Sequence, residues 1–222
     1  MRDAVIVSTA RTPIGKAYRG SFNATTPQAL AAHAITHAVK RAGIEGPEIS
    51  DCILGAALQQ GHSSTNIARQ AAIRAGLPVT VAGMSLDRQC ASGMMAIATA
   101  AKQVMYDGMD IVIGGGVESI SMVQTPEMRV GSDKWLKENK PEMYMTMLET
   151  AENVATRFNI SREAQDAYAA QSQQRTHAAQ QAGKLDDEVV TMSTTMMIQD
   201  KETREITSHD VTIEKDEGNR PG

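Results

Sequence analysis

The chain carries two cysteines, and one of them stands in a setting that suits nucleophilic chemistry. Cys90 lies between an apolar stretch, Val81 to Leu86, and a segment from Ala91 to Tyr106 that is rich in Ala, Met, Ile and Val. The first stretch predicts a buried strand, and the second predicts a mostly buried helix. A thiol at a helix start faces unpaired N–H groups and the positive end of the helix dipole, which favour the thiolate. Cys90 is therefore a candidate nucleophile, with an inert core cysteine as the alternative.

The elements around Cys90 predict an α/β fold. Apolar strands are expected at 3–9, 51–58, 81–86 and 110–114, with helices at 26–42, 65–75 and 91–106 between them. This alternation is typical of a mostly parallel sheet flanked by helices. Ligand chemistry in such sheets gathers at the carboxyl ends of strands, which is where Cys90 lies. Cys52 falls inside the second strand, and we interpret it as structural.

The chain changes character after Ser121. Residues 122–147 are rich in Met, contain the single Trp135 and show no clear period, which predicts an extended loop. Helices are expected at 150–158 and 161–182, followed by short strands at 189–192 and 205–211. We therefore predict two parts, at 1–121 and 122–222.

Composition excludes several classes of function. Of the 222 residues, 41% are hydrophobic and 22% are charged, which allows a real core. The net charge of −4 argues against a nucleic-acid surface, and no apolar run is long enough for a membrane span. The N-terminus has no signal-peptide layout, and two distant cysteines make no disulfide framework, so a cytoplasmic protein is expected.

Two further patterns are interpreted as structural. Gly114-Gly115-Gly116 follows a strand but lacks the spaced glycines of a dinucleotide site, and it predicts a tight backbone near Cys90. His33 and His37 lie four residues apart on a predicted helix, as metal ligands can. Because the sequence offers no third ligand beside them, we expect a polar helix flank and no metal site.

A series of short motifs runs in order along the chain. It consists of Arg11-Thr12-Pro13-Ile14-Gly15, Ala68-Arg69-Gln70, Cys90-Ala91-Ser92-Gly93, Gly114-Gly115-Gly116-Val117-Glu118-Ser119, Thr150-Ala151-Glu152-Asn153-Val154-Ala155 and Ser161-Arg162-Glu163-Ala164-Gln165-Asp166. This series resembles the N-terminal half of a thiolase, a family of acyl-CoA acyltransferases that make or cleave 3-ketoacyl-CoA. The resemblance implies a thiolase-like core domain at 1–121 that lacks its last strand, part of an inserted α/β loop domain at 122–222, and no C-terminal domain.

The same resemblance implies roles for three residues. Cys90 becomes the nucleophile that carries the acyl group as a thioester, Met147 packs near the acyl end, and Arg220 contacts the phosphates of CoA. The implied substrates are acyl-CoA, acetyl-CoA and CoA in fatty acid metabolism, with no permanently bound cofactor. The family also implies a homodimer, with a tetramer as the alternative, formed through the strand near Met84 to Leu86.

The sequence departs from the family pattern at three places. Asp87 stands where a small polar residue or Asn is usual. Leu148 and Glu149 follow Met147, where many thiolases have Gly. Thr146 precedes Met147, where members specific for acetoacetyl-CoA have His, and this leans away from that subtype.

Three catalytic motifs of thiolases are absent from the 222 residues: a Gly-His-Pro motif, an Asn-Glu-Ala motif and a second Cys before a glycine run. We therefore expect a fragment of a thiolase that has no turnover by itself. Two alternatives stay open. One is a decarboxylating ketoacyl synthase, which also uses a Cys at a helix start, and the other is a truncated, non-catalytic binding or assembly module.

Overall fold

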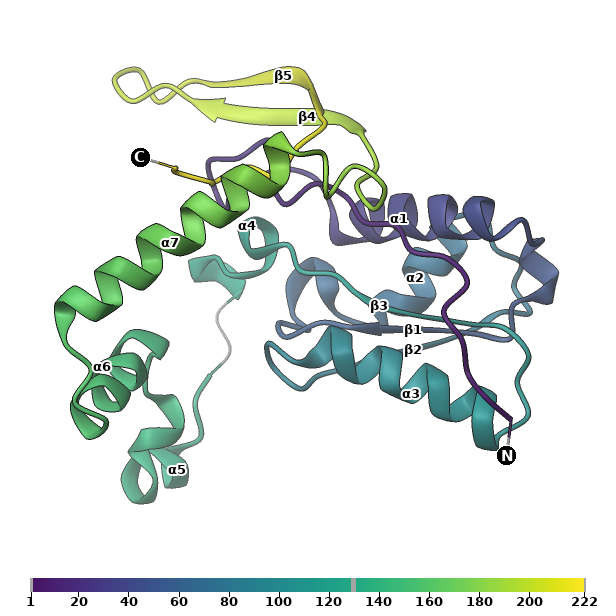
Figure 1. Ribbon diagram of the computed structural model, residues 1–222, viewed down its shortest axis with the longest axis horizontal. Helices are drawn as coiled ribbons and strands as arrows, with labels where there is room; N and C mark the ends of the chain where they lie inside the picture. The colour runs from purple at the N-terminus through teal and green to yellow at the C-terminus, as the bar shows by residue number, and fades with distance from the viewer. Residues whose placement is uncertain (1, 129–130, 222) are drawn as a thin grey trace. The chain divides into compact units, whose positions relative to one another are not determined.

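The computed structural model describes residues 2–128 and 131–221, which form two compact units (Figure 1). The first unit holds residues 2–128 and 186–218, and the second holds residues 131–185 and 219–221. The division into a core domain at 1–121 and a loop domain at 122–222 stays a prediction.

A three-stranded parallel sheet forms the centre of the first unit, in the order β2-β1-β3. The strands are β1 at Asp51–Gly55, β2 at Ala82–Leu86 and β3 at Val112–Gly116. All five residues of β1 are buried, as expected for a central parallel strand. Gly55 lies opposite Leu86 on one side and Gly116 on the other, so the carboxyl ends of the three strands are level.

Helices cover both faces of this sheet (Figure 1). They are α1 at Pro27–Ala42 and α2 at Ile67–Arg74 on one face, and α3 at Ser92–Tyr106 on the other. The side chains of β1 alternate accordingly: Cys52 joins the core formed with α1 and α2, and Ile53 joins the core formed with Ala96 and Ala100 of α3. The α/β class predicted from the sequence is confirmed.

The predicted strand at 3–9 is absent from the sheet. Val5, Ile6 and Val7 are more than 70% exposed, at 76%, 77% and 72%. The centre of the sheet is occupied, since β1 is hydrogen-bonded to β2 on one side and to β3 on the other, and the segment pairs with neither edge strand. The segment is held by side chains instead: the Ser8 hydroxyl donates to the Ala38 carbonyl at 2.8 Å.

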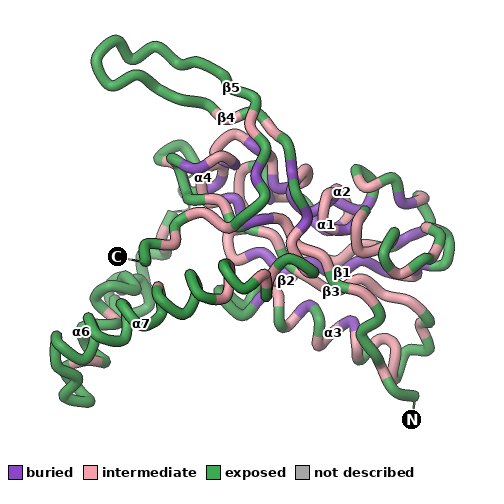
Figure 2. The backbone as a smooth tube through the Cα atoms, turned by 45° about the horizontal axis from the view of Figure 1, so that its top comes forward, coloured by how far each residue is buried: buried purple, intermediate pink, exposed green. Residues whose placement is uncertain are grey.

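An antiparallel hairpin completes the first unit, with β4 at Met192–Gln199 and β5 at Ile206–Ile213. Met192 and Ile213 pair at its base and are buried against Phe22 and Leu30. Most of the remaining hairpin is exposed, as the colouring of the projecting loop in Figure 2 shows. The strand predicted at 189–192 was placed too early, since it shares only Met192 with β4, and the strand predicted at 205–211 is confirmed within one to two residues at each end.

The second unit is helical. It contains α5 at Lys134–Asn139, α6 at Met147–Arg157 and α7 at Arg162–Gln181, and none of these helices has a buried residue (Figure 2).

The extended loop predicted at 122–147 is wrong for much of its length; residues 129 and 130 lie outside the described part. α4 at Ile120–Val123 overlaps its start, α5 lies inside it, and short 3₁₀ turns occur at Pro126–Met128 and Pro141–Tyr144. Helix caps rather than long periodicity specify these pieces, since Asp133 accepts the Leu136 N–H at 2.8 Å to start α5.

Candidate active site

Cys90 lies in the turn between β2 and α3 and is exposed. Ala91 is the N-cap of α3, and the helix begins at Ser92, so Cys90 stands one residue before the cap. The predicted position of Cys90, after a strand and at the start of a helix, is therefore confirmed. The strand was predicted as buried, but no residue of β2 is buried, because β2 lies at the edge of the sheet.

The turn before Cys90 has an unusual backbone. Gln89 has φ 49°, in the left-handed region. Its N–H donates to a carboxylate oxygen of Asp87 at 2.7 Å, and its carbonyl accepts the hydroxyl of Ser92 at 2.6 Å. The same Ser92 oxygen accepts the Arg88 N–H at 2.8 Å. Side chains on both sides of Cys90 therefore hold the residue that precedes it.

Two glycines let the sheet approach the first turn of α3. A Cβ on Gly55 would lie 2.2 Å from the carbonyl carbon of Ser92, and a Cβ on Gly116 would lie 3.1 Å from the Cα of Gly93. The tight backbone predicted at Gly114 to Gly116 is confirmed. The sequence interpretation missed Gly55, whose signal was a glycine at the end of an apolar strand.

The loops that follow β1 and β3 are hydrogen-bonded to each other, next to the contact between Gly55 and Ser92. Val117 donates its N–H to the Gly55 carbonyl at 3.0 Å, and Ala57 donates its N–H to a carboxylate oxygen of Glu118 at 2.8 Å. Glu118 belongs to the glycine-rich motif after β3, so its carboxylate fixes the edge of the sheet where the strands end. This hydrogen bond gives Glu118 a structural task that the sequence did not indicate.

The two cysteines lie in opposite environments. Cys52 is fully buried in β1, and this burial, with a smaller contribution from the neighbouring Asp51 charge, raises the pKa of its thiol to about 12. A thiol with such a pKa is almost entirely protonated near neutral pH and is a poor nucleophile. The interpretation of Cys52 as a buried structural residue is confirmed, and Cys90 is the accessible thiol.

A cavity of about 350 Å³ lies on the α1 side of the first unit. Three segments and Phe22 line it: the loop at 10–17, the first half of α1, and the end of β3 with the turn after it. The lining residues are Ala10, Arg11, Thr12, Pro13, Ile14, Gly15, Lys16, Ala17, Phe22, Leu30, Ala31, Ala34, Gly116, Val117, Glu118, Ser119, Ile120 and Ser121. Gly116 lines the cavity and also contacts Gly93, so the cavity reaches the backbone that supports α3.

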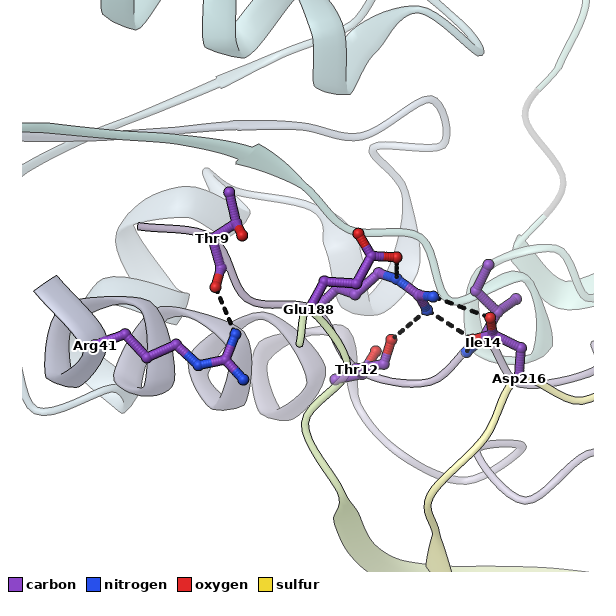
Figure 3. A network of polar contacts seen from close by, with 7 residues as sticks. Thr9, Thr12, Ile14, Arg41, Glu188 and Asp216 are labelled. Atoms are coloured by element: carbon purple, nitrogen blue, oxygen red, sulfur yellow. Dashed lines mark hydrogen bonds and ion pairs between the residues drawn. The ribbon is translucent and has the colours of Figure 1, made fainter. Parts of the chain in front are cut away.

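Arg11 connects this lining to two distant segments (Figure 3). Its guanidinium donates to Glu188 at 2.8 Å and to both carboxylate oxygens of Asp216 at 2.6 and 3.0 Å. Asp216 also accepts the Ile14 N–H at 2.8 Å. Burial would raise the pKa of Asp216, but hydrogen bonds from Arg11 and Ile14, with the Arg11 charge, outweigh it and hold the pKa below its usual range.

Met147 and Arg220 both belong to the second unit. Met147 is the first residue of α6 and is 73% exposed. The helix starts there because Thr146 and Glu149 form a capping box, in which each side chain accepts the other's backbone N–H. Arg220 is exposed, and its N–H donates to the Gln173 side chain of α7 at 2.8 Å.

His33 and His37 lie on α1 with ring centroids 4.6 Å apart. A ring nitrogen of His33 contacts the Thr191 carbonyl at 3.0 Å. Burial, together with the charges of His33, Arg41 and Lys40, lowers the pKa of His37. Within residues 2–128 and 131–221, no three His, Cys, Asp or Glu side chains gather as a metal site would require, and no helix has the length and apolar character needed to cross a membrane.

A parallel α/β fold with an exposed cysteine between a strand and the start of a helix defines a class in which acyl-transfer enzymes occur. The profile of the family described as "Thiolase, N-terminal domain" matches residues 4–222. The chain belongs to the thiolase family and corresponds to its N-terminal domain.

Individual relatives agree with this assignment. The chain is 39% identical over 221 residues to a 3-ketoacyl-CoA thiolase of Bacillus subtilis, covering 100% of this chain and 56% of that protein. It is 40% identical over 204 residues to an acetyl-CoA acetyltransferase of Cupriavidus necator, covering 86% of this chain and 51% of the relative. The crystal structure of the Bacillus anthracis acetyl-CoA acetyltransferase matches with a TM-score of 0.79 and 34% identity, over 99% of this chain and 56% of that one.

The chain thus spans about half the length of the curated relatives that it matches. The matches support neither the ketoacyl synthase nor the non-catalytic module that the sequence left open.

Proposed function

We propose that the chain supplies the nucleophilic half of a thiolase, an acyl-CoA acyltransferase, with Cys90 as the residue that accepts the acyl group. The observation that carries this proposal is an exposed Cys90 at the start of α3, within a chain that matches the thiolase N-terminal domain over residues 4–222. Acetyl-CoA C-acyltransferase is accordingly the proposed activity of the whole protein.

The proposed first step is a thioester exchange. The thiolate sulfur of Cys90 attacks the carbonyl carbon of an acyl-CoA, and the carbonyl oxygen takes up the electron pair. Collapse of this intermediate expels CoA as a thiolate and leaves the acyl group on Cys90. The backbone N–H of Cys90 and the N-terminal turn of α3 are the groups we assign to the developing oxyanion.

The second step needs groups other than the nucleophile. A carbon nucleophile from acetyl-CoA requires removal of a proton, and the 222 residues contain no Gly-His-Pro motif and no second Cys before a glycine run. General acid–base help is worth roughly 10²–10⁴-fold for each group. We therefore propose that this chain alone becomes acylated at Cys90 but does not turn over.

For CoA itself we propose contacts in the second unit. Arg220 is exposed, and a guanidinium suits phosphate through paired hydrogen bonds. Met147, exposed at the start of α6, is the proposed contact for the acyl end. CoA and acyl-CoA act as substrates, and no permanently bound cofactor is proposed.

The proposed protein partner is a second copy of the chain. β2 is an edge strand of the parallel sheet, which leaves one side of Met84 to Leu86 without a strand neighbour. An edge of this kind pairs readily with its copy across a two-fold axis. A homodimer through β2 is proposed, and a tetramer would need a further contact. The proposed location is the cytoplasm, on the grounds of the sequence layout and cysteine usage given above.

The experiment that tests the proposed function is acylation monitored by intact mass. The chain is incubated with acetyl-CoA, and the expected product carries one acetyl group, mapped by proteolysis to Cys90. The Cys52→Ala variant should still be acylated, and the Cys90→Ala variant should not. Absence of the adduct from the parent chain, or an adduct that survives in Cys90→Ala, would overturn the proposal.

A further inference from the structure

Gln89, the residue before Cys90, adopts a backbone conformation that is unfavourable for most residues other than glycine. Its φ of 49° brings the Cβ close to the following carbonyl oxygen, which is why left-handed residues are mostly Gly, Asn or Asp. Gln has no side-chain feature that offsets this strain. The surroundings of Gln89 must therefore hold it in place.

Two side chains hold the two polar groups of the Gln89 backbone. The Asp87 carboxylate accepts the Gln89 N–H at 2.7 Å, and the Ser92 hydroxyl donates to the Gln89 carbonyl at 2.6 Å. The Ser92 N–H donates to the same carbonyl at 3.0 Å. Cys90 is thus attached to a residue whose conformation is fixed from both sides.

The two supports differ in how they are anchored. Ser92 is only 3% exposed and lies under Gly55 at the end of β1, so the sheet itself holds it. Asp87 is exposed, and it acts on the turn through one hydrogen bond to the backbone. Asp87 can therefore be changed without opening the core.

We propose that Asp87 is a positioning residue for Cys90, because its carboxylate keeps Gln89 in the left-handed conformation from which Cys90 is presented at the start of α3. Its effect on acyl transfer rests on the proposed function, whereas its effect on the Cys90 thiol does not. The relevant property is the acceptor oxygen rather than the negative charge.

A matched pair of variants separates the acceptor from the charge. Asp87→Asn and Asp87→Ala both remove the charge, but only Asn keeps an oxygen that can accept the Gln89 N–H. We expect iodoacetamide to label Cys90 in Asp87→Ala roughly three- to tenfold more slowly than in Asp87→Asn, which is the range for loss of one hydrogen bond.

A rescue experiment tests the backbone strain directly. Glycine adopts positive φ without penalty, so Asp87→Ala/Gln89→Gly should recover the labelling rate, whereas Asp87→Ala/Gln89→Ala should not. In the parent background, Gln89→Gly should melt at a higher temperature than Gln89→Ala, the reverse of the usual order. Should Asp87→Ala fail to fold, we expect the added Gln89→Gly to restore a cooperative transition.

Three results would overturn the proposal: equal labelling of Asp87→Ala and Asp87→Asn, no recovery with Gln89→Gly, or a higher melting temperature for Gln89→Ala. Labelling is measured without CoA, and acylation by acetyl-CoA is measured in parallel. If no variant is acylated while the labelling order holds, the proposed function fails and the positioning role stands. If all variants are acylated and labelled alike, the positioning role fails alone.

Discussion

Arg11 and Asp216 are joined by two hydrogen bonds, of 2.6 and 3.0 Å, although 205 residues of sequence separate them. The second partner of Arg11 is Glu188, which lies two residues after Asp186, where the chain returns to the first unit. Asp216 lies two residues before Gly218, where the chain leaves this unit again. The guanidinium of Arg11 is therefore hydrogen-bonded to both segments at which the chain enters and leaves the first unit, through Glu188 and Asp216. Next to Asp216, Glu217 accepts the Lys16 N–H at 2.8 Å and reinforces this attachment.

Asp216→Asn should destabilise the first unit. The variant keeps the shape of the side chain but loses the charge that pairs with Arg11, and because the pair is partly exposed we expect a loss of about 1–2 kcal/mol. Urea unfolding measures the change in the free energy of unfolding. Glu202→Gln, an equal loss of charge at an exposed position in the hairpin turn, should be neutral within about 0.5 kcal/mol.

The same carboxylates predict how stability depends on pH. Asp216 and Glu217 both have pKa values below their usual range, so the unfolded chain takes up protons at a higher pH than the folded chain does. Their stabilisation is full above about pH 4–5 and is lost as the pH falls through the lowered native values. Asp216→Asn should therefore flatten the decline in the free energy of unfolding below about pH 4. A decline as steep as in the parent chain would contradict the assignment.

Cys90 should react with iodoacetamide far faster than Cys52. At pH 7.5 a thiol with a pKa of about 12 has a thiolate fraction on the order of 10⁻⁴ to 10⁻⁵, and Cys52 is also buried. We expect a ratio of labelling rates of about 10³ or more, read by peptide mapping. In a denaturant the ratio should collapse toward one. A folded chain that labels both thiols at similar rates would show that β1 opens readily.

Gly55→Ala should displace the first turn of α3. The added Cβ would meet the Ser92 carbonyl carbon at 2.2 Å and its oxygen at 2.3 Å, and backbone atoms cannot move aside cheaply. We expect a loss of about 3 kcal/mol or more in urea unfolding, with altered labelling of Cys90 in any folded protein. Gly115→Ala in β3 is the control, because its Cβ would meet only Leu54 Cδ2 at 3.5 Å. An equal effect of the two substitutions would argue against the close approach.

Ser85→Pro tests the proposed dimer. Ala82 donates its N–H to Ser50, and Leu86 accepts from Ala56, so these residues face β1 while the N–H of Ser85 faces the open edge. Proline removes that outward donor in addition to the Ser85 hydroxyl, and we expect sedimentation equilibrium to show at least tenfold weaker dimerisation. Ser85→Ala is the control, because it loses the hydroxyl that accepts the Ala68 N–H but keeps the outward donor. A parent chain that stays monomeric, or a dimer indifferent to proline, would refute pairing through β2.

The sequence best predicted the features that depend on neighbouring residues, such as helix ends. Thr26 caps α1, Pro27 opens it and Gly43 ends it, as the residue types indicated. Cys90 was found because the strand before it and the helix after it are both visible in composition. The start of α6 was placed three residues late at 150, although Thr146 and Glu149 form a capping-box signature that could have located it.

Features that depend on distant partners could not be predicted. Whether an apolar segment such as 3–9 becomes a strand depends on whether it pairs with an edge strand of the sheet, which only the assembled fold determines. The contact of Gly55 with Ser92 and the pairing of Arg11 with Asp216 join residues far apart in sequence. The hydrogen bond between Asp87 and Gln89 is local, but Gln89 has a positive φ, and the residue type Gln does not predict this conformation.

The exposed apolar segment at Val5 to Val7 bears on how the chain is expected to behave at high concentration. Three adjacent β-branched side chains, extended, unpaired and more than 70% exposed, have the composition of a nucleus for cross-β association. A net charge of −4 spread over 222 residues provides little repulsion at this one place. We therefore expect this segment to favour association at high concentration, and Ile6→Lys should raise the solubility of the protein.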